Sequence, residues 1–203
     1  MIEVKNLSLT LREPILQNAN FVFQDGQIYL LQALNGTGKT SVLRTMVSLL
    51  APDAGQVSFD GHEFMEVKQQ VFYLETADWF DKNLSGLDYM QFVKQEWQSD
   101  QKIETEINRW QMGDYVKMPI RKYSLGMKQK LLVSLYSLSG AKYLLMDEIN
   151  NGLDEDSRQV LYQQLVALKK HGKLIIMASH YQDEVASIVD QTLTLKKQRL
   201  VQE

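Results

Sequence analysis

Eight residues near the N-terminus have the spacing of a phosphate-binding loop. The segment from Ala33 to Thr40 matches G-x-x-x-x-G-K-[ST] at every fixed position except the first, where alanine replaces glycine. Gly36 and Gly38 let backbone N–H groups turn inward around a phosphate, and a helix starting near Lys39 adds its positive dipole end. Lys39 can reach the β- and γ-phosphates, and the Thr40 hydroxyl can ligate Mg²⁺. The predicted nucleotide-binding residues are Asn35, Gly36, Thr37, Gly38, Lys39, Thr40 and Ser41.

A polar loop that only caps a helix is the alternative interpretation of this segment. The apolar run before it and the helical run after it favour the nucleotide-binding interpretation, because phosphate-binding loops join a strand to a helix.

A carboxylate pair follows the apolar run Tyr143 to Met146, which we predict to be a buried strand. Asp147 would emerge at the carboxyl edge of the sheet, where ligands bind in such folds, and could ligate Mg²⁺. Glu148, one step on, could orient or deprotonate an attacking water. Acidic pairs at strand ends are also common as helix caps, so this interpretation depends on the phosphate-binding loop.

Ser179-His180 follows the next predicted strand, at the same edge. A histidine there could donate a hydrogen bond to a γ-phosphate and act in the transition state. We interpret His62, in a turn, and His171, at a helix end, as structural. The predicted catalytic residues are therefore Lys39, Glu148 and His180.

The elements that must position these residues alternate along the chain. We predict strands over residues 2–9, 20–23, 27–32, 56–60 and 71–74 and a helix over Thr40–Leu50. Strand signals then vanish from about Leu84 to Leu138, where polar and aromatic residues recur at helical spacing. The tail predicts strand 143–146, helix 156–170, strand 174–178 and helix 183–189.

This order predicts an α/β fold with a mostly parallel sheet covered by helices and an antiparallel N-terminal part. We expect one domain over residues 1–203, with a core at 1–83 and 139–203 and an inserted helical subdomain at 84–138.

The composition is that of a soluble globular protein, with 44% hydrophobic and 23% charged residues. A net charge of −3 leaves no basic surplus for nucleic-acid phosphates. The chain has no cysteine, which excludes disulfides and cysteine-based sites. The N-terminus has no signal-peptide pattern, and no apolar run reaches the roughly 20 residues of a membrane span. We expect a cytosolic protein.

Taken together, these segments resemble those of the ATP-binding cassette (ABC) family, the ATPase subunits of ABC transporters. The similarity rests on their order: the phosphate-binding loop, a helical insert, Ser-x-Gly at 124–126, the strand ending in Asp-Glu, Asn-Gly-Leu-Asp at 151–154 and Ser-His at 179–180. It covers essentially the whole chain and implies a P-loop NTPase fold with a RecA-like core.

The resemblance assigns roles to individual residues. Ser124 and Gly126 are similar to the signature motif, which binds the γ-phosphate held by an opposite subunit. Asp147 and Glu148 resemble the Walker B aspartate and the catalytic glutamate, residues 152–154 the D-loop, and His180 the switch histidine.

The implied cofactors are ATP and Mg²⁺, with Thr40, Asp147 and Glu75 as metal partners. The implied partners are a transmembrane permease subunit and a second ABC ATPase subunit, identical or related, without nucleic acid. The location implied is cytoplasmic and peripheral, at the inner face of the cell membrane through that membrane subunit.

The chain departs from the family pattern at several positions. Leu125 replaces the first glycine of L-S-G-G-Q, and Met127-Lys128-Gln129 is a variant associated with drug, antimicrobial-peptide or polysaccharide exporters. Glu75 replaces the Q-loop glutamine, although a carboxylate can still approach Mg²⁺, and Ile149 replaces a proline.

Two aromatic features also bear on the site. Residues 8–12, where the family commonly stacks an aromatic residue on the base, contain none, so Leu11 or Arg12 would cover the base. Trp79 and Phe80 fall where the family docks its membrane partner, but both could equally pack in the core.

We therefore expect an ATP hydrolase that pairs head to tail and drives a membrane subunit, with export favoured over import. A nucleotide-dependent dimerising protein with weak hydrolysis is a second hypothesis, motivated by Ala33, Glu75 and the missing aromatic. A soluble ABC protein acting on ribosomes or DNA is a third, which the single cassette and the lack of a basic surface disfavour. Small-molecule kinases and GTPases do not explain residues 124–129.

Overall fold

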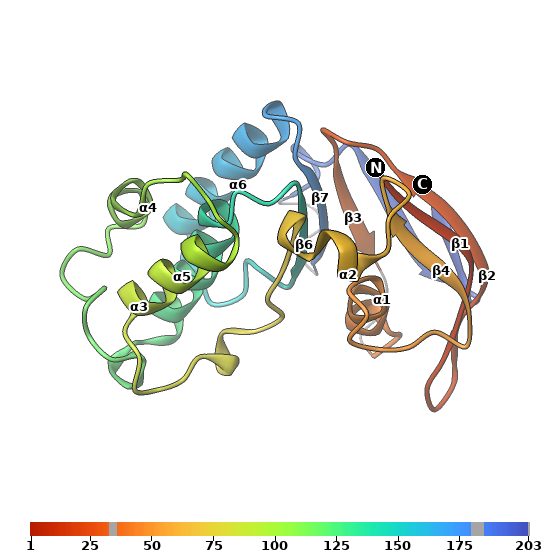
Figure 1. The fold of residues 1–203 in the computed structure, drawn as a ribbon, viewed down its shortest axis with the longest axis horizontal. Helices are drawn as coiled ribbons and strands as arrows, with labels where there is room; N and C mark the ends of the chain where they lie inside the picture. The colour runs from red at the N-terminus through yellow and green to blue at the C-terminus, as the bar shows by residue number, and fades with distance from the viewer. Residues whose placement is uncertain (33–35, 180–184, 203) are drawn as a thin grey trace.

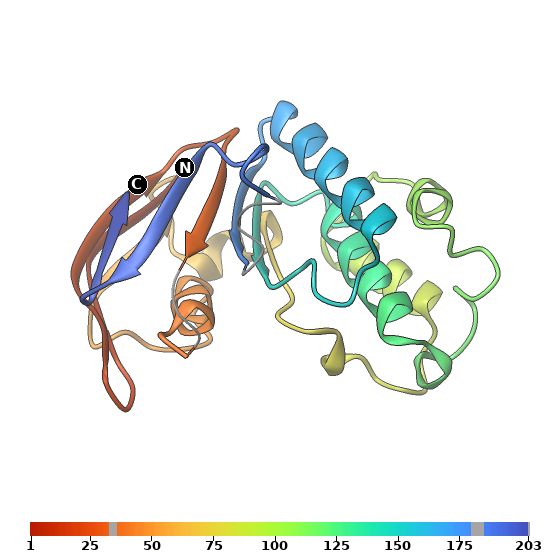
Figure 2. The same ribbon diagram turned by 180° about the vertical axis from the view of Figure 1, so that it is seen from behind.

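The computed structural model describes residues 1–32, 36–179 and 185–202, which form two sheets and the helices that cover them (Figures 1 and 2). The antiparallel sheet has the order β2-β1-β4, built from β1 (Ile2–Thr10), β2 (Pro14–Phe23) and β4 (Ala54–Phe59). The six-stranded sheet has the order β5 (Val71–Tyr73), β6 (Tyr143–Asp147), β7 (Leu174–Ala178), β3 (Ile28–Gln32), β8 (Gln191–Lys196) and β9 (Arg199–Gln202).

Only β9 runs antiparallel in the larger sheet. This arrangement confirms the predicted mostly parallel α/β fold with an antiparallel N-terminal part.

The helices gather on two sides of the larger sheet. Figure 1 shows α3 (Gly86–Glu96), α4 (Ile103–Arg109), α5 (Leu125–Leu138) and α6 (Glu155–Lys170) on one side, and α1 (Lys39–Met46) with the antiparallel sheet on the other. The shorter helices are α2 (Phe64–Val67), η1 (Lys68–Gln70), η2 (Ala77–Trp79) and η3 (Ile120–Lys122). The described elements between 84 and 138 are all helical, while the subdomain boundaries stay a prediction.

Side-chain alternation in the central strands creates a separate core on each face. Leu144 and Met146 of β6 pack with the large helices, whereas Tyr143 and Leu145 pack with α1 and the antiparallel sheet. Successive strand residues point to opposite faces, so a strand buried on both sides is apolar throughout. All five residues of β6 and of β7 are buried.

Tyr136 joins the helical layer to the sheet. Its hydroxyl, on α5, accepts a hydrogen bond from Leu74 N at 3.2 Å and donates to the Leu145 carbonyl at 2.7 Å. The ring packs edge-on against Phe72 of β5, with centroids 4.8 Å apart. The hydroxyl therefore satisfies a backbone group of β6 and one of the residue that follows β5.

Two predicted helix ends are wrong. The helix expected over Thr40–Leu50 ends at Met46, because Ser48 adopts a left-handed conformation (φ 56°) and Leu49 N bonds back to Arg44 O. The helix expected to reach Val189 gives way to a turn after Val185. There Asp190 accepts a hydrogen bond from Ile28 N at 2.8 Å, which holds the chain at the amino end of β3.

Strands β8 and β9 were not predicted. The alternation Thr-Leu-Thr-Leu at 192–195 carries their signal, since Leu193 and Leu195 are buried and the threonines are not.

We predict that Tyr136→Phe lowers the free energy of unfolding by about 1–3 kcal/mol, because it strands buried backbone groups. Tyr115→Phe is the matched control: among the described residues its buried hydroxyl has no hydrogen-bond partner, and burial raises its pKa to about 12. That change should be neutral or stabilising. Urea unfolding of both variants checks this, and equal losses would contradict the assignment.

Candidate functional site

The carboxyl ends of three central strands lie level with one another. In the paired register Asp147 lies opposite Ala178, and Ala178 lies opposite Leu31 of β3. The segments that follow β3, β6 and β7 therefore meet at one edge, which is where ligands bind in open α/β sheets. The predicted Asn35 and His180 belong to these segments but lie outside the described residues.

Helix α1 begins at this edge without a side-chain cap. Its cap residue is Gly38 (φ 106°), and a Cβ there would lie 2.6 Å from the Ile15 side chain. No acidic residue occupies the first turn, and Lys39 is buried. A glycine cap gives the first-turn N–H groups no side-chain oxygen, and the helix dipole and Lys39 add positive charge. The arrangement suits a phosphate.

Thr40 and Asp147 are in direct contact at the edge of the sheet. The Thr40 hydroxyl donates a hydrogen bond to Asp147 Oδ2. Burial raises the pKa of the Asp147 carboxyl, while the bond from Thr40 opposes that rise. A hydroxyl and a buried carboxylate side by side are a suitable donor pair for Mg²⁺, which binds through one or two carboxylates together with substrate phosphates.

Within the described ranges, no group of three or more His, Asp or Glu side chains is placed to hold a metal ion. The protein residues here thus fit a magnesium ion that a bound phosphate helps to hold.

Glu148 directly follows Asp147 in a left-handed backbone conformation. Its φ is 48°, its N–H donates to Ala178 O at 2.8 Å, and its Oε2 accepts from Asn151 Nδ2 at 2.5 Å. A non-glycine residue with positive φ is uncommon and marks a constrained position. Glu148 lines a cleft of about 380 Å³ together with Thr40 and Asp147.

Glu75 lines the same cleft but has its own partners. Its two carboxylate oxygens accept from Arg44 Nε and Nη2, each at 2.6 Å, and Oε2 also accepts from the Tyr73 hydroxyl at 2.9 Å. Arg44 holds the pKa of the Glu75 carboxyl below its ordinary value. The role of Glu75 as a metal partner stays a prediction, and the structure adds Arg44 as a residue that the sequence did not single out.

The segment at Ser124 forms the N-terminus of α5. Ser124 is exposed and its Oγ accepts from Met127 N at 3.2 Å, so it caps the helix. Leu125 is 64% exposed and packs on Gly152, where a Cβ would lie 2.9 Å from the leucine side chain. Ser124 and Gly126 line neither the cleft at Asp147 nor the one beside the phosphate-binding loop.

Gln129 joins the same helix to the segment that follows β6. Its Nε2 donates to the Ile149 carbonyl at 2.5 Å. Farther along that segment, Asn150 Oδ1 accepts from Ser179 Oγ at 3.2 Å. These buried contacts connect α5, the end of β6 and the end of β7, and nothing in the sequence pattern predicted the pairings.

A larger cleft, of about 1050 Å³, lies beside the phosphate-binding loop. Three segments line it: residues 10–15, residues 36–38 with Ser41, and Leu195, Lys197 and Gln198 of the β8–β9 hairpin. The sequence had suggested Leu11 and Arg12 there, and both line the cleft. The hairpin residues were not anticipated.

The two aromatic residues that follow Glu75, Trp79 and Phe80, differ in burial. Phe80 is buried and packs against Tyr89, with ring centroids 4.7 Å apart, whereas Trp79 is half-exposed. A further apolar groove, of about 430 Å³, lies between the end of α1 and helix α3, where Leu49 and Phe92 are both exposed.

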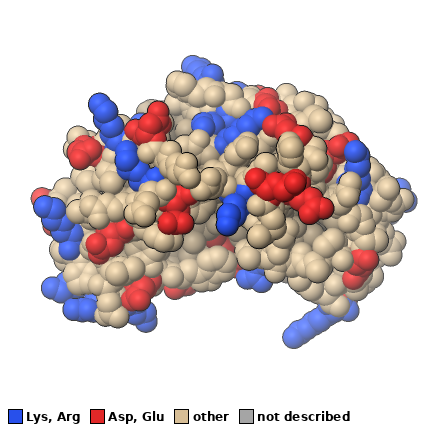
Figure 3. Space-filling view, in the orientation of Figure 1, with Lys and Arg blue, Asp and Glu red and all other residues tan. Residues whose placement is uncertain are grey.

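Surface charge is mixed on the face shown in Figure 3, where acidic and basic side chains are interspersed. Over the described ranges, none of the helices has the length and apolar character needed to cross a membrane.

We predict that the Arg44–Glu75 pair makes stability depend on pH. The pKa of the Glu75 carboxyl is lower in the folded state than its ordinary value of 4.5. The pair therefore stabilises the fold at pH values above 4.5, and this contribution is lost as the pH falls from 4.5 through the lowered pKa. Arg44 is 44% exposed, which limits the contribution to about 1 kcal/mol.

Urea unfolding without nucleotide or metal checks this. The stability difference between wild type and Glu75→Gln should be largest near neutral pH and shrink below about pH 4.5. A difference that stays constant with pH would contradict the pairing.

Comparison with known proteins shows the family to which this chain belongs. A family model described as ABC transporter matches residues 16–151. The lantibiotic transport ATP-binding protein SrtF of Streptococcus pyogenes is 30% identical over 94% of this chain and 84% of its own length. The uncharacterised ABC transporter ATP-binding protein YybJ of Bacillus subtilis is 29% identical over 98% and 94%.

The fold agrees with these sequence matches. A solved structure titled "Structure of ATP binding subunit of ABC transporter" superposes with a TM-score of 0.90 over 100% of this chain and 89% of that one, at 20% identity. Since the family model covers most of the chain, this protein belongs to the ABC transporter family, as an ATP-binding domain.

Proposed function

We propose that this chain binds ATP with Mg²⁺ and hydrolyses the γ-phosphate bond to drive a separate membrane subunit. The observation that carries this proposal is the contact of Thr40 with buried Asp147, with Glu148 beside them in one cleft at the start of α1. These residues combine a phosphate site, a magnesium site and a carboxylate able to act on water.

Each residue has a distinct part in the proposed reaction. Lys39 and the first-turn N–H groups of α1 hold the phosphates, and Thr40 and Asp147 hold the metal. Mg²⁺, when bound, would neutralise charge on the phosphate oxygens. Glu148 orients the attacking water and accepts its proton, and Asn151 holds the carboxylate in place through the 2.5 Å hydrogen bond. His180 is proposed to contact the γ-phosphate.

A second ATPase subunit, identical or related, completes the proposed site. Ser124 and Gly126 are accessible at the N-terminus of α5 yet line neither cleft of their own chain. A helix N-terminus offers N–H donors to an anion. These residues therefore serve the nucleotide of a partner, and closure of the pair on ATP is the motion that does work on the membrane subunit.

The membrane partner is supported by the relatives. SrtF is named a lantibiotic transport protein, and cbiO1 of Clostridium perfringens is described as part of the ABC transporter complex cbiONQ. We propose that the apolar groove with exposed Leu49 and Phe92 receives the permease at the inner face of the cell membrane. Export is the proposed direction, because Met127-Lys128-Gln129 resembles the exporter variant.

Glu148→Gln should bind ATP within a few-fold of wild type and hydrolyse it at least about 100-fold more slowly, because the water loses its base. Phosphate release and ATP affinity check this, ideally with the membrane partner present. Glu104→Gln, an exposed change on α4, is the control and should leave turnover unchanged. A wild type no faster than Glu148→Gln would favour instead a dimerising protein with weak hydrolysis.

Ser124→Arg should abolish ATP-driven dimerisation, because the large cation blocks the surface offered to the partner's phosphate. Light scattering in the Glu148→Gln background, with ATP and Mg²⁺, measures the pair. Ser85→Ala removes the equivalent cap from α3 and should still dimerise, which controls for the lost cap hydrogen bond. Normal dimerisation of Ser124→Arg would refute the shared site.

A further inference from the structure

The turn between β8 and β9 holds two long polar side chains in a conformation that disfavours them. Lys197 has φ 47° and Gln198 has φ 64°. Two-residue hairpin turns of this kind select Asn-Gly or Asp-Gly, because most side chains are strained at positive φ. A strained pair of this kind is a reason to look for a function at the turn.

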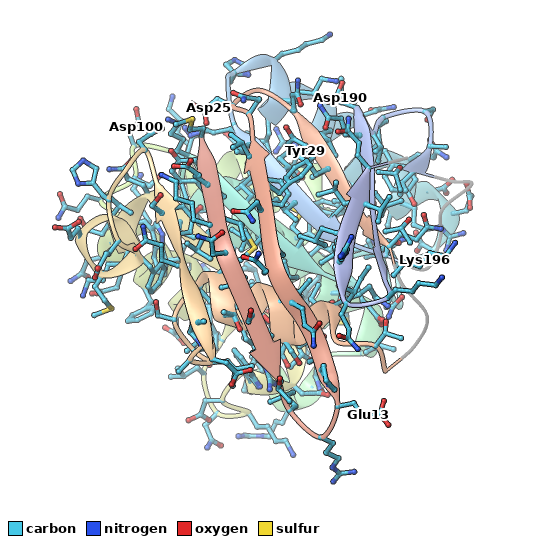
Figure 4. All side chains as sticks on the ribbon, turned by 90° about the vertical axis from the view of Figure 1, so that its right-hand side faces the viewer. Glu13, Asp25, Tyr29, Asp100, Asp190 and Lys196 are labelled. Atoms are coloured by element: carbon cyan, nitrogen blue, oxygen red, sulfur yellow. The ribbon has the colours of Figure 1, made fainter. Side chains whose placement is uncertain are left out.

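The turn lies next to the phosphate-binding loop, which indicates what this function could be. Lys197 and Gln198 line the 1050 Å³ cleft opposite residues 10–15, and the same cleft reaches Gly36, Thr37, Gly38 and Ser41 of the phosphate-binding loop. The Gln198 carbonyl accepts from Gln17 N of β2 at 2.8 Å, which fixes the tip. In Figure 4, Glu13 of the β1–β2 loop lies near the bottom of the view, and Lys196, beside the turn, lies at its right-hand side.

The walls of this cleft contain aliphatic and polar groups. Leu11 of the β1–β2 loop and Ile15 of β2 provide aliphatic side chains, and no aromatic ring is among the described lining residues. Bases are commonly held by stacking on aromatic rings. Without a ring, binding depends on aliphatic contact with the base face and on hydrogen bonds to the ribose and base edges.

We propose that Lys197 and Gln198 bind the ribose and base of the nucleotide whose phosphates occupy the phosphate-binding loop. This inference rests on the proposed function. The Gln198 amide is both donor and acceptor, so it can pair with the edge of adenine or of guanine. Lys197 is exposed and Gln198 is half-buried, so neither forms a closed pocket that rejects one base. The site therefore binds ATP and GTP with affinities within a few-fold of each other.

The test variant is Lys197→Asn with Gln198→Gly, which gives the turn its preferred residues. Its melting temperature should rise by about 2–4 °C, because strain is relieved. Its affinities for ATP and GTP should fall roughly five- to tenfold, because side-chain contacts are lost. Isothermal titration calorimetry with Mg²⁺ measures both nucleotides.

Inorganic tripolyphosphate distinguishes binding of the phosphates from binding of the ribose and base. It has no ribose or base, so its affinity should not change in the double variant. Lys196→Asn removes one positive charge next to the turn without touching the cleft lining and should leave nucleotide affinity unchanged. Gln198→Glu keeps the side-chain length but removes the donor, and it should weaken binding of both nucleotides.

Each outcome is decisive. Unchanged nucleotide affinity in the double variant, or an equal loss for tripolyphosphate, overturns the assignment of Lys197 and Gln198 while leaving the proposed function intact. ATP bound by wild type more than about tenfold tighter than GTP overturns the claim of weak base selection. A wild type that binds neither nucleotides nor tripolyphosphate overturns the proposed function itself.

Discussion

The arrangement of the site depends on one buried carboxylate at the end of a central strand. Asp147 is only 7% exposed and has the Thr40 hydroxyl as its direct partner across the sheet edge. Burying a charge is costly unless it is paired, and burial accordingly raises the pKa of this carboxyl, against which the Thr40 hydrogen bond acts. The level ends of β3, β7 and β6 bring Thr40, at the start of α1, to that carboxylate.

Most of the fold was predictable because its strongest signals are local. The runs at 143–146 and 174–178 are apolar on both faces, which is typical of central parallel strands, and β7 has the predicted bounds. The predicted helix ends at Leu50 and Val189 were wrong. Ser48 in a left-handed conformation and Asp190 bonded to Ile28 ended these helices earlier, and neither feature has a distinct sequence signature.

In the candidate site, too, some residues could be predicted from the sequence and others could not. Thr40, Asp147 and Glu148 could be selected from their positions after predicted strands and loops, and the structure brings them together in one cleft. Arg44 could not be selected, since its pairing with Glu75 joins residues far apart in sequence. Lys197 and Gln198 could not be selected either, because their importance comes from a positive φ and from packing of the hairpin against β2.

Leu125 shows how a departure from a family pattern changes contacts within the chain. The leucine side chain lies against Gly152, where a Cβ would be 2.9 Å from it, and both residues are exposed. Gln129, one turn farther along the helix, donates to the Ile149 carbonyl and so joins α5 to the segment after β6. Asn151, next to Gly152, donates to the Glu148 carboxylate, so the residue that holds Glu148 is a chain neighbour of the residues that contact α5. The surface that we propose for a partner subunit and the proposed base of the reaction are thus connected through one short segment of the chain.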